Sequence, residues 1–336
     1  MKLNRDRGIA FISVLLFLIT AAVAGVVYKW FSFVLSSGSS QNVRTVYYEV
    51  KPKVGAQRIA EELASLGVVS DSRFFYWYSR ISGKSKKFRA GDYRFSTKMT
   101  PDEVMAILMS GISFGLPLTV PEGYTIAQIA QVLEGIRPGT AESFKSLCQD
   151  KRFIKGLGFA KSPHSLEGYL FPDTYSVLRN EPVEEIIRKM VRKYRAVYTP
   201  ELEMRASQLG MTEQQVITLA SIVEKETGAK HERPLIASVF HNRLKKKMRL
   251  QSDPTVIYGV KNYQGNITRK HLDAVTPYNT YQISGLPKGP IANPGKEAIL
   301  AALYPVESTY LYFVSHNDGT HEFSSTYEDH MKAVAK

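Results

Sequence analysis

Residues 8–28 form an uncharged and mostly apolar run of 21 residues near the start of the chain. As a helix, such a run extends about 30 Å, the thickness of the hydrocarbon core of a bilayer. Three basic residues lie within residues 1–7, whereas only Lys29 follows the run before Arg44. Because positive residues collect on the cytoplasmic side of a membrane, the pattern predicts a transmembrane helix over 8–28 with a cytoplasmic tail of residues 1–7.

A cleaved signal peptide is the competing interpretation, because Ala22-Val23-Ala24 resembles a cleavage site. The apolar run continues through residues 25–28, however, and is longer than the core of a typical signal peptide. The run therefore favours a permanent single-pass anchor in the cytoplasmic (inner) membrane. Either interpretation places the remainder of the chain in the periplasm or another extracytoplasmic space.

The composition argues against several classes of function. The 336 residues carry a formal net charge of +13, but the basic residues are scattered, apart from small clusters at 84–87 and 245–247. The sequence has no zinc-finger spacing or basic recognition helix, so nucleic-acid binding is not expected. A basic surface suits an anionic polymer or lipid headgroups better. The seven histidines form no metal-binding pattern, and no nucleotide-binding glycine motif occurs. We therefore expect neither a metal nor a cofactor.

The pattern after the apolar run predicts an α+β organisation. Residues 29–44 are expected to form a flexible linker, because residues 36–42 are small and polar. Residues 45–113 then predict a small βααβ module with a trailing helix. Its predicted strands are 45–50 and 91–95, its predicted helices are 57–64 and 71–79, and Thr100 is the expected N-cap of the trailing helix.

Residues 114–336 predict a larger mixed α+β domain. Helices are expected over 182–197, 213–227 and 233–244, and a β-hairpin is expected over 310–323. Between them, residues 251–294 are rich in Pro, Gly, Asn and Tyr. Long patterned loops of this kind usually line a site.

The predicted helix 213–227 carries two acids where buried residues are expected. Apolar residues between 216 and 223 cover one wide arc, and Glu224 and Glu226 project into opposite flanks of that arc. The positions expected on the wet face are Thr218, Ser221 and Lys225. A buried carboxylate either finds a basic partner or takes up a proton.

Glu226 is the stronger candidate for a proton donor. It lies in the last predicted turn, before Gly228 as the expected C-cap, where the helix dipole disfavours a further negative charge. This position predicts a pKa raised more than that of Glu224. The alternative is an ion pair between Glu226 and Arg233 or Arg243. A carboxylic acid that stays protonated near neutral pH is what enzymes that cleave glycosidic bonds require.

Three further segments combine acids or amides with aromatic residues. They contain Glu167 (within 165–175), Asp253 and Tyr258 (within 251–258), and Asn279 (within 278–281). Aromatic faces with polar neighbours suit sugar rings, which present apolar C–H faces and hydroxyl rims. The alternatives are a buried aromatic plug around Glu167 and a simple helix-capping role for Asp253.

Several long motifs, in order along the chain, resemble the endolytic murein transglycosylases (the MltG or YceG-like family). The segments that carry the resemblance are 220–227 (Ala-Ser-Ile-Val-Glu-Lys-Glu-Thr), 167–174, 249–258, 278–281 and 285–291. The resemblance implies a single-pass anchor, a LysM-like module at 45–113 and a catalytic domain at 114–336. It also implies that Glu226 is the catalytic acid. Substrate-binding roles are expected for Glu224, Glu167, Asp253, Tyr258 and Asn279.

The reaction implied by this resemblance is non-hydrolytic cleavage of the MurNAc–GlcNAc β-1,4 bond of peptidoglycan glycan strands, which leaves 1,6-anhydroMurNAc ends. A single acid/base residue suffices for it, unlike the carboxylate pair of ordinary glycosidases. The resemblance further implies that the enzyme works beside peptidoglycan synthases and terminates nascent strands. Two alternatives stay open at this point: a non-catalytic, membrane-anchored glycan-binding scaffold and a hydrolytic muramidase.

Overall fold

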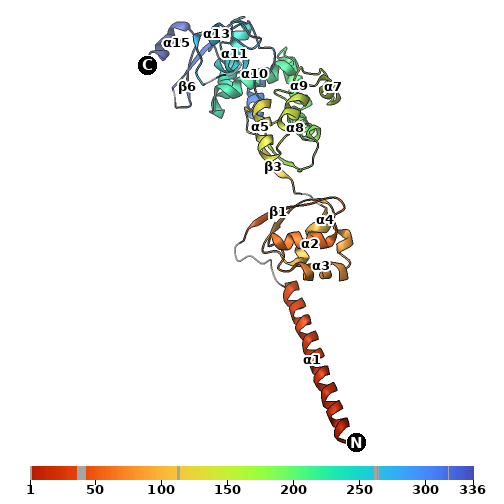
Figure 1. The fold of residues 1–336 in the computed structure, drawn as a ribbon. Helices are drawn as coiled ribbons and strands as arrows, with labels where there is room; N and C mark the ends of the chain where they lie inside the picture. Colours follow the sequence, from red (N-terminus) through yellow and green to blue (C-terminus); the bar gives the residue numbers. More distant parts are fainter. Residues whose placement is uncertain (1, 36–42, 112–113, 261–262, 264, 317) are drawn as a thin grey trace. The chain divides into compact units, whose positions relative to one another are not determined.

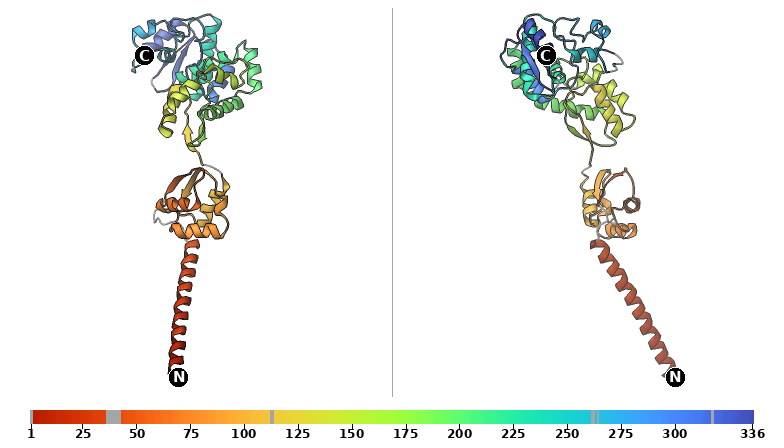
Figure 2. Two further views of the ribbon diagram at one scale, coloured as in Figure 1. Left: turned by 45° about the vertical axis from the view of Figure 1, so that its right-hand side comes forward. Right: turned by 90° about the vertical axis from the view of Figure 1, so that its left-hand side faces the viewer.

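The computed structural model describes residues 2–35, 43–111, 114–260, 263, 265–316 and 318–336, with side chains from Val14 onward. The described chain is a mixed α+β protein, and it divides into two compact units, Met1–Gly115 and Leu116–Lys336 (Figures 1 and 2).

The N-terminal apolar segment forms a longer helix than the sequence predicts. Helix α1 spans Lys2–Leu35, so residues 29–35, expected in the linker, are helical. The helix continues because Trp30 and Phe33 find aromatic partners: Phe33 is buried and stacks on Phe74 at 5.7 Å between ring centroids. Among the described residues, Val14–Leu35 is the one stretch long and apolar enough to cross a membrane. The predicted polar tether at 36–42 lies outside the described residues.

The remainder of the first unit has the predicted βααβ order with a trailing helix. Its elements are β1 (Thr45–Val50), α2 (Ala56–Ser65), α3 (Ser72–Ile81), the 3-10 turn η1 (Ser85–Lys87), β2 (Gly91–Ser96) and α4 (Pro101–Ser110). Strands β1 and β2 pair antiparallel, from Thr45 opposite Ser96 to Val50 opposite Gly91. Alternate residues of both strands, such as Tyr48 and Phe95, are buried with Phe75 of α3. The predicted capping box at Thr100 is present, with Pro101 as the first helical residue.

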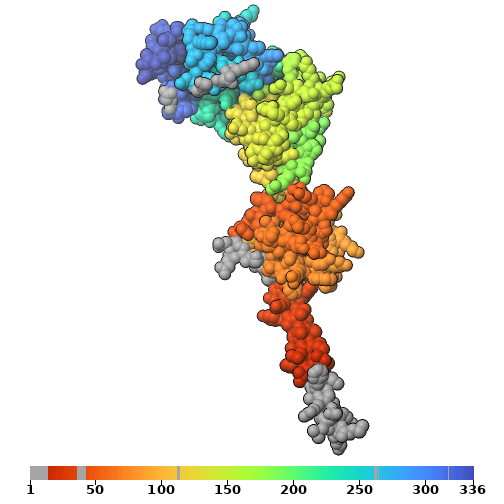
Figure 3. Space-filling model, viewed as in Figure 1, coloured from red at the N-terminus to blue at the C-terminus, as the bar shows by residue number. Residues whose placement is uncertain are grey.

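In its described residues, the second unit combines helices with two short antiparallel strand pairs. Its elements are β3 (Leu116–Thr119), α5 (Ile126–Ile136), α6 (Ala141–Leu147), α7 (Lys151–Gly156), β4 (Thr174–Val177), α8 (Val183–Val197), α9 (Pro200–Gln208), α10 (Glu213–Glu226), η2 (Lys230–Glu232), α11 (Arg233–Lys245), α12 (Asp253–Gly259), α13 (Arg269–Asp273), α14 (Lys296–Leu303), β5 (Tyr312–Ser315), β6 (His321–Ser324) and α15 (Tyr327–Val334). Strand β3 pairs with β4, and β5 pairs with β6. The yellow and yellow-green segments α5–α8 lie on the opposite side of this unit from the blue β5, β6 and α15 (Figure 3).

Helix α10 is the central helix of the second unit, packed against α11 and α14. Every residue from Val216 to Val223 is buried, including Thr218 and Ser221. The expectation that these two face water is therefore wrong. Their hydroxyl groups are satisfied inside the protein: Thr218 donates to the Gln214 carbonyl oxygen, and Ser221 donates to that of Thr218 and accepts from the Ile291 amide. A short hydroxyl side chain that bonds within its own helix can be buried at little penalty.

The C-terminal end of α10 also differs from the prediction. The helix stops at Glu226, and the capping residue is Thr227 in an extended conformation (φ −141°, ψ 138°) rather than Gly228 in a left-handed one. An extended backbone suits a β-branched residue. The chain therefore turns sharply away after Glu226, which leaves the end of the Glu226 side chain accessible from outside the helix.

Candidate active site

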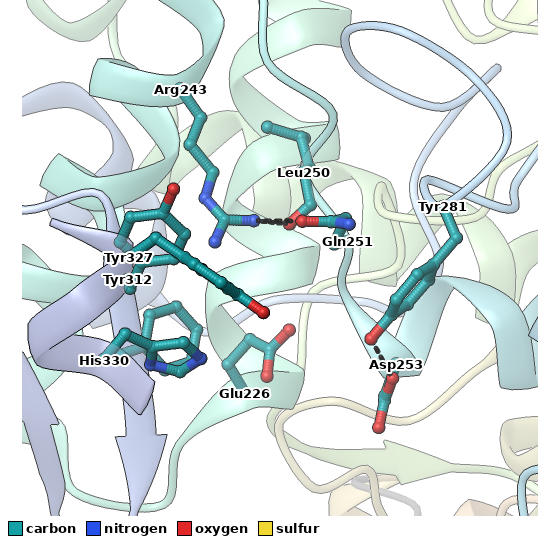
Figure 4. A pocket seen from close by; sticks show the side chains of 10 residues that line it. Glu226, Arg243, Leu250, Gln251, Asp253, Tyr281, Tyr312, Tyr327 and His330 are labelled. Atoms are coloured by element: carbon teal, nitrogen blue, oxygen red, sulfur yellow. Dashed lines mark hydrogen bonds between the residues drawn. The ribbon is translucent and has the colours of Figure 1, made fainter. Parts of the chain in front are cut away.

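Glu226 lies at the wall of a cavity of about 380 Å³ in the second unit (Figure 4). The cavity is lined by Glu226, Arg243, Leu250, Gln251, Asp253, Tyr281, Tyr312, Phe313, Tyr327 and His330. Figure 4 shows the Glu226 carboxyl group between Tyr312 and His330 on one side and Asp253 and Tyr281 on the other. The lining comes from α10, α11, the segments around 251 and 281, and the C-terminal hairpin and helix, so residues distant in sequence meet around Glu226.

The surroundings of Glu226 favour its protonated form. Burial raises the pKa of its carboxyl group to about 7, well above the ordinary value of 4.5. A hydrogen bond from Ser252 lowers this pKa, the negative charge of Asp253 raises it, and the positive charge of Arg243 lowers it. Burial is therefore the main cause, rather than the helix dipole that the sequence analysis considered. The expected direction of the shift is the same.

Ser252 is a contact of Glu226 that the sequence analysis did not single out. Its hydroxyl group donates a short hydrogen bond to Oε1 of Glu226. Two threonines hold Ser252 in place: its amide donates to Oγ1 of Thr280 at 2.9 Å, and its carbonyl oxygen accepts from Oγ1 of Thr255 at 2.6 Å. The sequence feature that could have identified Ser252 is its position immediately before Asp253, within the polar and aromatic segment 251–258.

Arg243 lies in the same cavity but makes no ion pair with Glu226. Its Nε donates to the carbonyl oxygen of Leu311 at 2.7 Å, and its Nη1 donates to that of Leu250 at 2.8 Å. The alternative of a Glu226–Arg243 ion pair is therefore wrong. Arg243 thus joins the segment at Leu250 to the residue before β5. Its charge still acts on Glu226 at a distance.

A second hollow of about 310 Å³ also contains Glu226 and lies beside the β5–β6 hairpin. Its lining residues are Glu226, Thr227, Gly228, Phe313, Ser315, Gly319 and His321. Glu232 holds His321 in place: one carboxylate oxygen accepts from the His321 amide at 3.0 Å, and the other contacts its Nδ1 at 2.7 Å. Glu226 and Phe313 thus line both hollows.

Glu224, only two residues before Glu226, has a closed environment. Its buried side chain accepts from Nη2 of Arg233 at 2.6 Å and from the Gly295 amide at 2.9 Å. Burial raises its pKa, and the Gly295 hydrogen bond and the Arg233 charge lower it. The predicted placement of the two acids on opposite flanks of α10 is confirmed. The partner considered for Glu226, Arg233, belongs to Glu224 instead, and Glu224 is absent from the lining of both hollows around Glu226.

Glu167 and Tyr258 lie together, but away from the Glu226 cavity. Glu167 is buried and accepts from the Ile126 amide and the Asn293 amide group at 3.0 Å each, and from the Tyr258 hydroxyl at 3.1 Å. Burial raises its pKa to about 7, and these hydrogen bonds lower it. Glu167 borders a separate hollow of about 360 Å³ with Tyr278. Its hydrogen bonds join four segments of the unit.

Asp253 and Asn279 have different surroundings. Asp253 lines the Glu226 cavity, accepts from the Tyr281 hydroxyl at 2.7 Å, and is the first residue of α12, whose N-cap is Ser252. Its interpretation as a mere helix cap is therefore wrong. Asn279 is buried, and its amide nitrogen donates to carbonyl oxygens within residues 271–274, the nearest at 2.7 Å. Of the six predicted site residues, the structure thus brings Glu226 and Asp253 into one cavity.

The chemical capacity of this site follows from Glu226, whose pKa is about 7. A carboxylic acid with a pKa near 7 can give up a proton and recover it at neutral pH. Aromatic residues and polar side chains around it suit the two faces and the rim of a sugar ring. Among the described residues, no group of three or more His, Cys, Asp or Glu side chains could hold a metal ion. The fold and site therefore define a candidate acid-catalysed, carbohydrate-cleaving protein.

Comparison with known proteins gives the family. The model of the YceG-like family matches residues 48–336, and the chain belongs to this family. The chain is 35% identical over 309 residues to a protein of Bacillus subtilis named endolytic murein transglycosylase, covering 87% of this chain and 84% of that one. It is 30% identical over 359 residues to a protein of the same name from Streptococcus pneumoniae, and here it spans 64% of the relative's length.

A solved structure is similar over most of the chain. The crystal structure of a yceG-like protein from Listeria monocytogenes is 32% identical and has a TM-score of 0.62. The similarity covers 86% of this chain and 98% of the Listeria chain.

Proposed function

We propose that this protein is a membrane-anchored endolytic lytic transglycosylase that cleaves the MurNAc–GlcNAc β-1,4 bonds of peptidoglycan. The observation that carries the proposal is the position of Glu226, an acid with a pKa of about 7. It borders the cavity drawn in Figure 4 and also the hollow beside the β5–β6 hairpin. An endolytic enzyme must bind sugar on both sides of the bond that it breaks. The name shared by the Bacillus and Streptococcus relatives agrees with this activity.

Glu226 can carry both proton transfers of the reaction. Its carboxyl group donates a proton to the glycosidic oxygen as the bond from that oxygen to C1 of the MurNAc residue breaks. The C6 hydroxyl oxygen of the same MurNAc then forms a bond to C1, and its proton returns to Glu226. The products are a strand with a 1,6-anhydroMurNAc end and a strand with a free GlcNAc hydroxyl group, with no water consumed. The hydrogen bond from Ser252 orients Glu226 for these transfers.

A hydrolytic muramidase is the second candidate, because Asp253 lines the same cavity as Glu226. In an inverting hydrolase, a second carboxylate activates water. Mass spectrometry of digested glycan strands separates the two reactions, since an anhydro end is lighter by one water than a reducing end. We expect anhydro ends from the wild type and from Asp253→Asn. Reducing ends that disappear in Asp253→Asn would establish hydrolysis and overturn the proposal.

The proposed location of the enzyme in the cell rests on α1 and the first unit. We infer that α1 anchors the chain in the cytoplasmic membrane with residues 1–7 inside, so that the site acts on the extracytoplasmic side. We further infer that residues 45–113 form a LysM-like module that captures glycan, and that the enzyme terminates nascent strands beside peptidoglycan synthases. Fractionation with N-terminal sequencing tests the anchor, because a soluble product starting near Gly25 would establish a cleaved signal peptide instead. A folded protein starting near Leu116 should still cleave glycan, with weaker binding.

A further inference from the structure

The apolar surface of α1 continues past the point where α1 meets the first unit. Phe31 and Leu35 are 62% and 78% exposed, and the candidate membrane span extends to Leu35. Contact with α3 begins earlier: Trp30 lies 6.1 Å from Phe74 and 5.7 Å from Tyr78 between ring centroids. A bilayer that covers the exposed apolar residues of α1 therefore reaches the level of α3. In Figure 1, α3 lies beside the end of α1.

One face of α3 touches α1, and part of this face does not pack against the core of the unit. Phe74, Trp77, Tyr78 and Ile81 have the i, i+3, i+4, i+7 spacing of one helix face. Phe74 and Tyr78 contact Trp30, whereas Trp77 and Ile81 are 54% and 72% exposed. The side chains of α3 that are buried in the core of the unit are on another face, at positions 75 and 79. The exposed apolar face thus continues the surface of the anchor.

Basic residues border this apolar stripe. The exposed ones are Arg73 and Arg80 on α3, and Lys86 and Lys87 on η1. Within the part of the chain that the structure describes, no carboxylate pairs with Arg73, Lys86 or Lys87, whereas the neighbouring Lys84 pairs with Asp102. Tryptophan with lysine and arginine is the composition found at the headgroup level of a membrane, where basic residues attract anionic lipids.

We propose that Trp77, Ile81, Arg73, Arg80, Lys86 and Lys87 form a lipid-binding surface, here called the α3 surface, that rests on anionic phospholipid headgroups. Trp77 and Ile81 enter the interfacial layer, and the basic residues contact lipid phosphates. This inference rests on the anchoring part of the proposed function. Its consequence is that the first unit lies on the membrane with a defined face, instead of moving freely on a tether.

The test uses the full-length chain in vesicles of phosphatidylcholine and phosphatidylglycerol in equal parts. Ile81→Cys is labelled with a polarity-sensitive fluorophore, and quenching by lipids with a nitroxide at a shallow acyl position is measured. Cys148 is fully buried, so the label goes to the introduced thiol. The matched control is Tyr47→Cys, because Tyr47 is exposed on the face of β1 opposite its buried neighbours Val46 and Tyr48.

We expect the label at position 81 to be quenched several-fold more strongly than the label at position 47. Lys86→Gln with Lys87→Gln should reduce this quenching in the mixed vesicles. Equal quenching at the two positions would overturn the proposal. Loss of quenching at position 81 on addition of glycan strands would also overturn it, because glycan would then occupy the α3 surface. Flotation of the same vesicles distinguishes failure of the α3 surface from failure of the proposed anchor. A chain that does not float with the vesicles would refute the anchor itself.

Discussion

The two acids at the end of α10 are two residues apart, yet they lie in contrasting environments. Glu224 is enclosed and paired with Arg233 and with the Gly295 amide. Glu226 is surrounded by protein but opens onto two hollows, and its closest partner is the neutral Ser252. Burial raises the pKa of both carboxyl groups. The two acids differ in what offsets the cost of a buried negative charge. Arg233 stabilises Glu224 as an anion, whereas Glu226 has no cationic hydrogen-bond partner and its protonated form is favoured.

This contrast shows how one helix end can supply both a structural and a chemical acid. A buried ion pair removes a carboxylate from chemistry because its charge is already compensated. A buried acid without a cationic hydrogen-bond partner is unfavourable as an anion and is poised to exchange protons.

Glu226→Gln should have the largest effect. Glutamine keeps the shape of the side chain but cannot donate and recover a proton, so we expect turnover to fall by about 10²–10⁴-fold. The measurement is the rate of anhydro-end formation from glycan strands by mass spectrometry. Glu224→Gln is the matched variant and should retain most of its activity per folded molecule. If the two variants exchange these phenotypes, the assignment of the catalytic acid to Glu226 is wrong, although the proposed reaction can stand.

Glu224→Gln should instead lower stability. The substitution removes the nearer of two carboxylates from the buried Arg233 guanidinium and leaves the more exposed Glu122, whose oxygen lies 3.5 Å from Nη2. Breaking a buried ion pair completely costs about 3–5 kcal/mol, and we expect a loss up to this size. Urea unfolding at neutral pH measures the change. The double variant Glu224→Gln with Arg233→Met removes both charges and should recover most of the loss. No recovery in the double variant would mean that the ion pair is not the cause.

Glu226→Gln should stabilise the protein at high pH. The pKa of Glu226 rises from 4.5 in the unfolded chain to about 7 in the folded protein. The stability linked to this group is therefore fully present below pH 4.5 and is lost as the pH rises through about 7. A shift of this size corresponds to about 3 kcal/mol. Unfolding at pH 8 and at pH 4 should show a gain for the variant at pH 8 only. An equal effect at both values would contradict the raised pKa.

The smallest effects should appear as opposite displacements of the pH–rate profile. Glu226 must be protonated to act first as an acid, so activity should decline as the pH rises past about 7. Asp253→Asn removes a charge that raises the pKa of Glu226, and it should move the decline to lower pH. Ser252→Ala removes a hydrogen bond that lowers this pKa, and it should move the decline to higher pH. Displacements in the same direction would argue against these electrostatic roles.

Much of the organisation of the chain could be predicted from local patterns. The strand at 45–50, the capping box at Thr100 and the helix at 213–227 were predicted to within about two residues, because apolar periodicity and capping chemistry act over short distances. The family resemblance is confirmed over residues 48–336. The LysM-like character of the first unit and the roles of the site residues stay predictions.

That α10 carries two acids on different flanks follows from the sequence, because helical geometry sets the direction of each side chain. The partners of the two acids depend on tertiary packing. Arg233, which follows η2, pairs with Glu224. Ser252, the N-cap of α12, donates to Glu226 and is held in place by two threonines. Burial of Thr218 and Ser221 likewise depends on the packing of α11 and α14 around α10. Such contacts join residues distant in sequence, and no local pattern encodes which of them meet or how deeply each acid is buried.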